Sequence, residues 1–303
     1  MSRLKIISPE EERNILLQYQ SQLQQYHQAQ NQQFEQFQQL TQLNNNFNNL
    51  QLQQPSSQVY LPTPSSITNA NSTLEAIEDF KNRNENWRSI FEECKDELYK
   101  IATALDSRIP WEGHYVPNKC NLFKAFELCP LDKVRVVIFG QDPYYQILSD
   151  GTPKAQGISF SVSKNDDIPK SLMSIYKEIK KSYPGWERPL HGDLSSWCSQ
   201  GVLMLNVCLT CAPNLKEVHL KYKVWLPFIT KILKAIAQIR PNCIYVMWGN
   251  PAQDLEQYLN EKSIKLKTSH PSGLSSYRGF DGCNHFKMIN DHLQSFGESP
   301  IIW

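Results

Sequence analysis

Four short runs of β-branched and other apolar residues alternate with segments of helical spacing beyond residue 74 of this 303-residue chain. The apolar runs are VRVVIFG at 134–140, VLMLNV at 202–207, CIYVMWG at 243–249 and SIKLKT at 263–268. The segments of helical spacing are 77–101, 171–183, 221–239, 251–259 and 284–296. Strands joined by crossover helices run parallel, because each helix carries the chain back across the sheet. The pattern therefore predicts an α/β fold of three layers, a mostly parallel sheet flanked by helices on both faces.

The N-terminal part of the chain has a different composition. Gln and Asn dominate from about residue 15 to residue 58, and a segment rich in Pro, Ser and Thr follows. Apolar residues at 16–26 keep the spacing of a coiled coil, but the next one, Phe34, falls out of register. The composition favours a disordered or transiently helical tail over an oligomerisation helix. We predict a tail and linker over residues 1–75 and a folded domain over residues 76–303.

Charge narrows the range of functions. The formal net charge is +1, which argues against a polycationic nucleic-acid binder, although residues 76–303 alone hold 28 Lys and Arg against 25 Asp and Glu.

The N-terminus carries three consecutive glutamates and lacks the apolar core of a signal peptide. No run of 18 apolar residues occurs. We expect a protein that is neither secreted nor membrane-spanning, with a local DNA-binding face if it binds DNA.

The eight cysteines are scattered, and several lie inside apolar runs. This usage is typical of reduced core residues in an intracellular protein. Cys208 and Cys211 have the spacing of a redox or zinc pair. No second pair and no matching histidines accompany them, so the sequence disfavours a metal site.

Polar residues stand where three of the apolar runs end. Gln141 and Asp142 follow the first run, Asn206 closes the second, and the fourth leads into a loop that contains His270. Each has an ordinary structural explanation: a turn cap before a proline, a buried amide bonded to backbone, and a loop histidine. In open parallel sheets, however, ligands bind outside the carboxyl ends of the strands. We therefore predict that one pocket collects these side chains.

Several segments resemble, in order and spacing, the motifs of family-1 uracil-DNA glycosylases. The segments are GQDPYY at 140–145, ISFSV at 158–162, HGDLSSW at 191–197, GVLMLNVCLT at 201–210 and HPSGLSSYRGF at 270–280. The resemblance covers roughly residues 76–303, and it makes this region the expected catalytic domain. ISFSV is expected to be an extended piece. Two positions depart from the family pattern: Tyr145 stands where a histidine is usual, and Gly273 where HPSPLS has its second proline.

The resemblance implies hydrolysis of the N-glycosidic bond between uracil and deoxyribose, without metal or organic cofactor. Asp142 would stabilise the cationic sugar and orient water, and His270 would stabilise the uracil anion as a neutral donor. The base must leave the duplex to be reached. The residues implied in uracil binding are Gln141, Tyr144 against the methyl group of thymine, Phe160 as the stacking ring, and Asn206 as the reader of the base edge. The residues implied in DNA binding are Pro169, Ser171, Asn250, Ser272, Leu274 as an apolar wedge, Tyr277 and Arg278.

The expected partner is uracil-containing DNA, single- or double-stranded, bound by a monomeric catalytic domain. The tail would bind protein partners of its own. The nucleus is the expected location, with mitochondrion or a viral replication site as alternatives. Two other functions remain open at this point: a non-catalytic replication or processivity scaffold with the same fold, and a glycosylase of altered base preference.

Overall fold

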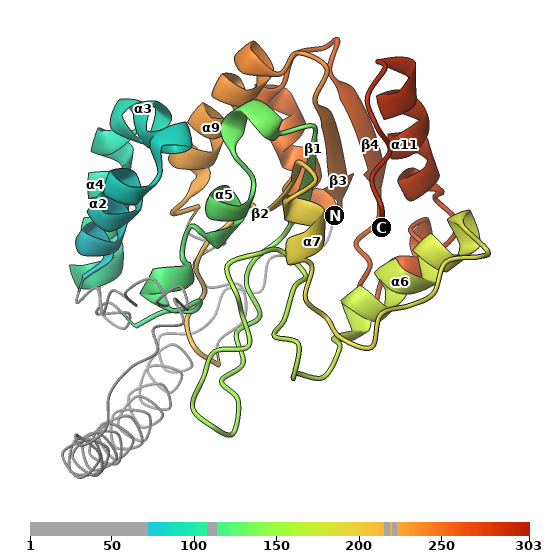
Figure 1. Cartoon of the computed structure of the whole chain (residues 1–303). Helices are drawn as coiled ribbons and strands as arrows, with labels where there is room; N and C mark the ends of the chain where they lie inside the picture. The colour runs from blue at the N-terminus through green and yellow to red at the C-terminus, as the bar shows by residue number, and fades with distance from the viewer. Residues whose placement is uncertain (1–71, 108–113, 215–218, 220–222) are drawn as a thin grey trace, which may run out of the picture. The chain divides into compact units, whose positions relative to one another are not determined.

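The computed structural model describes residues 72–107, 114–214, 219 and 223–303. Apart from 149–151, these residues belong to one compact unit. Figure 1 shows its helices and strands. The α-helices are α2 (Thr73–Arg83), α3 (Glu85–Glu93), α4 (Lys95–Ser107), α5 (Lys124–Leu128), α6 (Lys170–Ser182), α7 (Ser195–Cys198), α9 (Leu226–Ile239), α10 (Asn250–Gln253) and α11 (His285–Ser295). The strands are β1 (Val136–Gly140), β2 (Val202–Asn206), β3 (Ile244–Trp248) and β4 (Ile264–Thr268). The 3-10 helices are η1 (Lys119–Asn121), η2 (Leu131–Lys133), η3 (Asp254–Tyr258) and η4 (Ser276–Arg278).

Within the described residues, the four strands form one parallel sheet in the order β2-β1-β3-β4. Every residue of β1, β2 and β3 is buried, which accounts for their continuous apolar sequences. Strand β4 lies at the edge, and its alternating Lys265 and Lys267 keep that edge charged. All four predicted strands are confirmed to within two residues at each end.

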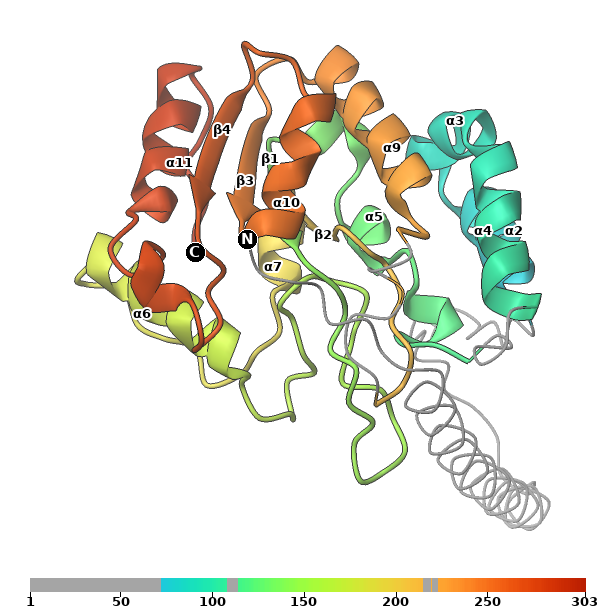
Figure 2. The same cartoon turned by 180° about the vertical axis from the view of Figure 1, so that it is seen from behind.

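Helices cover both faces of the sheet, as predicted. Helix α7 lies in front of the strands in Figure 1, whereas α9 and α10 lie in front of them in the opposite view of Figure 2. Trp197 of α7 packs on Phe286 of α11 with ring centroids 6.3 Å apart, and Phe286 packs on Trp248 of β3 at 5.8 Å. These contacts place α7 and α11 on one face. The three-layer α/β/α prediction is confirmed.

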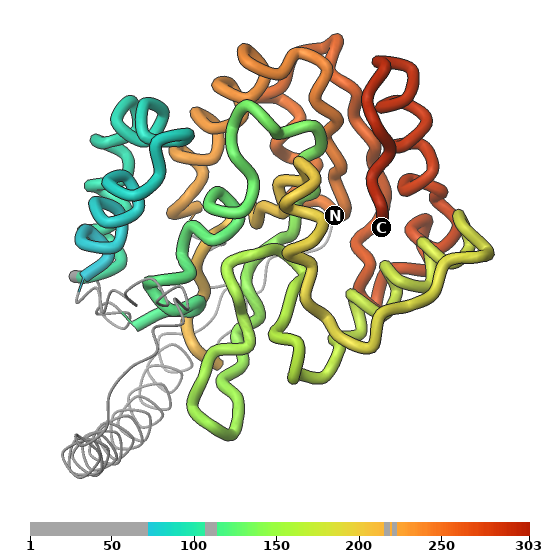
Figure 3. Tube along the Cα trace, viewed as in Figure 1, coloured from blue at the N-terminus to red at the C-terminus, as the bar shows by residue number. Residues whose placement is uncertain are grey.

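The segment 77–101, predicted as helical, is divided among three helices. Asn84 caps α3 by accepting a hydrogen bond from the Trp87 backbone N–H, and α4 starts anew after Cys94. Figure 3 traces these helices, coloured cyan to teal, beside the part of the chain that carries the sheet. Phe91 joins them to α9 through an edge-on contact with Phe228 at 5.2 Å.

The expectation of an extended piece at 158–162 is wrong. The segment contains a turn, and Phe160 has a φ of 62°, which few residues other than glycine adopt. The turn is held from both sides: the Ser159 N–H donates to the Met204 carbonyl at 3.0 Å, and the Ser161 hydroxyl accepts from the Leu194 N–H at 3.0 Å. These tertiary bonds override the local preference for an extended chain.

Two other predictions differ in detail. The helix expected at 251–259 is the short α10 followed by the 3-10 helix η3. The helix expected at 221–239 begins only at Leu226: residues 223–225 form a turn, and residues 221–222 lie outside the described residues. Most of the predicted tail, residues 1–71, also lies outside the described residues. Helix α2 begins at Thr73, whose N–H donates to Asp106 at 2.9 Å, so the last residues of the predicted tail are helical. The domain boundary itself stays a prediction.

Within the described residues, no helix combines the length and the apolar character that crossing a membrane would require.

Candidate active site

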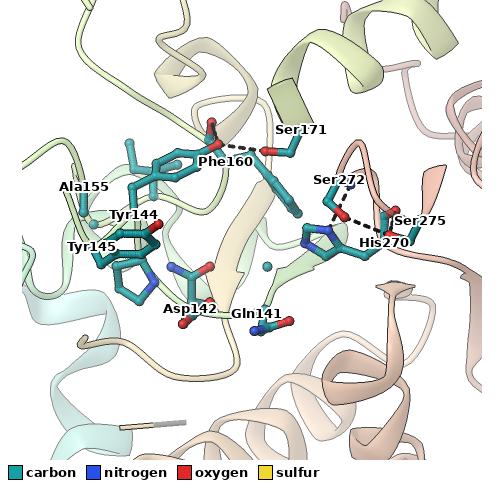
Figure 4. Close-up of a pocket in the computed structure, with 15 residues that line it drawn as sticks. Gln141, Asp142, Tyr144, Tyr145, Ala155, Phe160, Ser171, His270, Ser272 and Ser275 are labelled. Carbon is teal, nitrogen blue, oxygen red and sulfur yellow. Dashed lines mark hydrogen bonds between the residues drawn. The ribbon is translucent and has the colours of Figure 1, made fainter. Parts of the chain in front are cut away.

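A cavity of about 290 Å³ opens at the carboxyl ends of β1 and β2. Figure 4 shows its side chains converging from β1, from the loops that follow β1 and β4, and from the start of α6. The lining residues are Gly140, Gln141, Asp142, Pro143, Tyr144, Tyr145, Ala155, Gly157, Ile158, Phe160, Ser171, Asn206, His270, Ser272 and Ser275. The predicted meeting of Gln141, Asp142, Asn206 and His270 in one pocket is therefore confirmed.

Asn206 reaches the cavity because of the strand register. The last residues of β1 and β2, Gly140 and Asn206, are direct partners, and the pairing continues where the Val207 N–H donates to the Gly140 carbonyl at 2.9 Å. A Cβ on Gly140 would lie 2.2 Å from Asn206 Oδ1. Only glycine lets the amide occupy this place.

The amide of Asn206 is poised for a ligand. Asn206 is only 8% exposed. Its Oδ1 atom is buried and has no hydrogen-bond partner among the described residues. Buried polar atoms are usually paired, so an unpaired one at a cavity wall needs an explanation. A bound polar molecule would supply the missing donor.

Phe160 forms an aromatic wall. Its ring packs 5.7 Å from Trp248 and 5.7 Å from the His270 ring, and the residue is only 7% exposed. The Tyr144 hydroxyl donates to the Phe160 carbonyl at 3.2 Å and lies 3.1 Å from Ser171 Oγ. Burial raises the pKa of Tyr144 well above its usual value, with the Ser171 contact acting in the opposite direction. The phenol is therefore neutral and rigidly held.

The tautomer of His270 follows from its loop. Its Nδ1 accepts a hydrogen bond from the Ser272 backbone N–H at 3.1 Å, so the proton of a neutral ring must sit on Nε2. Figure 4 shows the second ring nitrogen directed away from Ser272. Ser275 locks the same loop, because its hydroxyl donates to the His270 carbonyl at 2.8 Å and contacts Ser272 Oγ at 2.8 Å.

Gly249, the residue after β3, packs closely against His270. Gly249 follows β3 with a φ of +89°, and a Cβ there would lie 3.0 Å from His270 Cβ. Its N–H donates to the Thr268 carbonyl at 2.9 Å, which ties the end of β3 to the end of β4. The histidine is thereby held close to the end of the sheet.

Asp142 lines the cavity from the loop after β1, close to a second segment of chain. Its Oδ2 lies 4.0 Å from the thiol of Cys211. Further along the same loop, the Tyr145 carbonyl accepts a hydrogen bond from the Asn214 N–H at 2.8 Å. Tyr145, the departure from the family pattern, lines the same cavity.

Of the predicted DNA-binding residues, Ser171 and Ser272 line the cavity, and the others do not. Pro169 is the N-cap residue of α6, and Asn250 is exposed at the start of α10. Leu274 is 80% exposed, which is unusual for a large apolar side chain. The remaining pair, Tyr277 and Arg278, is exposed, with the guanidinium Nε donating to the Tyr277 hydroxyl at 3.0 Å.

The sequence argument missed several lining residues. Ser275 lies inside the HPSGLSSYRGF segment, and a serine repeated every three residues there was the available signal. Ala155, Gly157 and Ile158 also line the cavity, and their residue types carry no chemical signal in the sequence. Among the described residues, no group of three His, Cys, Asp or Glu side chains is placed to hold a metal ion. None of the eight cysteines, all of which lie among the described residues, forms a disulfide.

Comparison with known proteins identifies the family. The family model described as the Uracil DNA glycosylase superfamily matches residues 126–294, which is more than half of the chain. The chain belongs to this superfamily. A uracil-DNA glycosylase of Yersinia pestis is 39% identical over 221 residues, covering 72% of this chain and 94% of the relative. One from Escherichia coli is 38% identical and covers 72% and 93%.

Solved structures agree with this membership. The crystal structure of mimivirus uracil-DNA glycosylase superposes with a TM-score of 0.70 at 29% identity, covering 81% of this chain and 96% of that one. The chain is thus a uracil-DNA glycosylase, a DNA-repair hydrolase that acts on the N-glycosidic bond. The resemblance noted in the sequence is confirmed at the level of family and activity.

Proposed function

We propose that the cavity binds uracil flipped out of DNA and that Asn206 reads it. The observation that carries this proposal is the buried Asn206 Oδ1, which has no partner among the described residues and lies in the cavity wall. Uracil presents an N3–H donor beside an O4 acceptor, and a carboxamide accepts from the first and donates to the second. Cytosine presents the opposite pair, so its binding would leave buried polar groups unpaired.

The aromatic residues would define the shape of the base site. Phe160 offers its ring for stacking, backed by Trp248 at 5.7 Å. Tyr144 would fill the space that the C5-methyl group of thymine needs. Its hydroxyl contacts to Phe160 and Ser171 support this role, because they prevent the ring from moving aside. Gln141 lines the cavity next to Asp142 and would contact the base through its backbone or amide.

The chemistry would be divided between Asp142 and His270. Cleavage passes through a sugar with cationic character and a base with anionic character, and preorganised groups stabilise each. The ionised Asp142 would stabilise the sugar cation and orient the water that attacks it. His270 would donate from Nε2 to uracil O2 as negative charge grows there, since its Nδ1 is already occupied by the Ser272 N–H. The product would be free uracil and an abasic site.

The rim would hold the DNA. Small polar groups at Ser171, Ser272 and Asn250 suit backbone phosphates, which position a duplex without reading its sequence. Leu274, exposed beyond the His270 loop, would enter the stack that the flipped nucleotide leaves. Pro169, Tyr277 and Arg278 would complete this surface. The expectations of a monomeric domain, of tail-binding partners and of a nuclear location remain predictions.

The decisive experiment measures uracil release from an oligonucleotide with the full chain and with Asp142→Asn and His270→Leu. Each substitution should lower turnover by about 100-fold or more while uracil-DNA binding is largely kept. Equal losses of affinity and turnover would point to a folding role for these residues. Unchanged turnover in both variants would show that neither residue carries the chemistry proposed for it.

A further inference from the structure

The segment that holds the CxxC pair of Cys208 and Cys211 is hydrogen-bonded to the loop that carries Asp142. Two backbone hydrogen bonds join the two segments: the Cys208 N–H donates to the Gln141 carbonyl at 3.1 Å, and the Asn214 N–H donates to the Tyr145 carbonyl at 2.8 Å. Cys208 and Asn214 lie on either side of Cys211 in the sequence, and Gln141 and Tyr145 lie on either side of Asp142. The segments are therefore held together at both ends.

The position of Cys211 is fixed more firmly than that of an ordinary loop residue. Its N–H donates to the Val116 carbonyl at 3.0 Å, and its carbonyl accepts from the Val116 N–H at 2.9 Å. It is fully buried in a small cluster with Val116 and Ala155, against which Tyr144 and Tyr145 pack. Its side chain thus has little freedom, and its thiol lies 4.0 Å from Asp142 Oδ2.

The two thiols of the pair have different surroundings. The Cys208 thiol donates to the Thr210 carbonyl at 3.2 Å, so it is engaged with its own segment. Burial raises the pKa of Cys208 well above its usual value, which keeps it protonated and unreactive. Redox use of the pair is therefore disfavoured, and Cys211 is the member whose thiol lies next to the Asp142 carboxylate.

We propose that Cys211 is a positioning residue, whose S–H donates to Asp142 Oδ2 and holds the carboxylate in its working orientation. The proposal rests on the proposed function of Asp142. A thiol is a weak donor, but an ionised acceptor strengthens the bond, and the carboxylate can only accept. Catalytic groups must be held within about 0.5 Å of their productive geometry, so even a weak bond from a rigid residue affects the rate.

Such a bond would also affect the pH dependence of the reaction. A donor stabilises the ionised carboxylate, so its loss moves the acidic limb of the pH–rate profile to higher pH. Among the described residues, the titratable groups near Asp142 are Cys208 and Cys211 from the neighbouring segment, Tyr144 and Tyr145 from its own loop, and His270 across the cavity. A purely structural role of Cys211 would lower the rate without moving the limb.

The test is the single-turnover rate of uracil release by the full chain between pH 5 and 8. Cys211→Val removes the donor but keeps an apolar side chain, and Cys211→Ser restores a donor. We expect the valine variant to be about three- to tenfold slower near neutral pH, with DNA affinity unchanged and the acidic limb at higher pH. The serine variant should lie within about twofold of the unchanged protein, with the limb restored.

Cys208→Ser is the matched control, since it makes the same change three residues away and should alter neither rate nor profile. If Cys211→Val fails to fold, Cys211→Ala provides the donor-free comparison. The proposal would be overturned if Cys211→Val and Cys211→Ser slowed uracil release equally and left the acidic limb of the pH–rate profile in place. It would also be overturned if Cys211→Val released uracil at the unchanged rate while Asp142→Asn was slow. If Asp142→Asn releases uracil at the full rate, the function proposed for Asp142 fails, and the role of Cys211 fails with it.

Discussion

Gly140→Ala tests whether the strand register sets uracil recognition. Gly140 does not have a left-handed φ, so alanine is not excluded by backbone conformation. The added Cβ would instead lie 2.2 Å from Asn206 Oδ1 and 2.8 Å from Ser159 Cβ. Ordinary contacts of such a carbon begin at 3.4 Å, so the amide must move by at least about 1 Å.

This displacement allows an estimate of the effect. A misplacement of about 1 Å in a binding group can cost about 100-fold in rate. We therefore expect kcat/KM for uracil release to fall by about two orders of magnitude. The crowding against Ser159 should also lower the free energy of unfolding by about 1–3 kcal/mol. Steady-state release from a uracil oligonucleotide and urea denaturation measure the two quantities.

Two controls separate displacement of the amide from general damage. Gly185→Ala places a Cβ in open space in an exposed turn and should change neither quantity. Asn206→Ala should itself be slow, and adding Gly140→Ala to it should slow release little further, because the displaced group is already gone. A Gly140→Ala variant as fast as the unchanged protein would refute the reasoning. Fully additive losses in the double variant would show that glycine acts through something other than Asn206.

The remaining predictions concern specificity, DNA, stability and the tail. Tyr144→Ala should release thymine measurably, whereas Tyr144→Phe, which keeps the ring, should not; equal thymine release by both would contradict the steric role. Leu274→Ala should slow release from duplex more than from single-stranded DNA, and equal slowing would exclude a wedge. Burial lowers the pKa of His285 from 6.5 to about 4, so the unfolded chain binds a proton that the folded chain does not, and stability falls as the pH drops through this window. His285→Asn, which keeps an acceptor for the Trp248 indole N–H, should reduce the loss between pH 7 and 4.5 by about 2–3 kcal/mol in urea denaturation. Deletion of residues 1–71 should leave oligonucleotide activity within a few-fold, and a collapse of activity in a folded protein would show that the tail completes the DNA site.

The sequence alone determined the layers and the location of the pocket. Its four apolar runs are β-branched and bounded by polar or glycine residues, a local signal that needs no knowledge of the rest of the chain. Because the carboxyl ends of parallel strands meet at one edge, the polar residues after those runs had to lie together. Gln141, Asp142, Asn206 and His270 were found in this way, before any contact was known.

Only the tertiary structure decided how those side chains are held. The left-handed turn at Phe160 depends on hydrogen bonds to Met204 and Leu194, and its local sequence favours an extended chain instead. The unpaired amide of Asn206 depends on its register with Gly140, 66 positions earlier. The contact between Cys211 and Asp142 likewise joins residues 69 positions apart. Such contacts are set by packing between distant segments, whereas sequence patterns report conformational preferences over a few neighbouring residues.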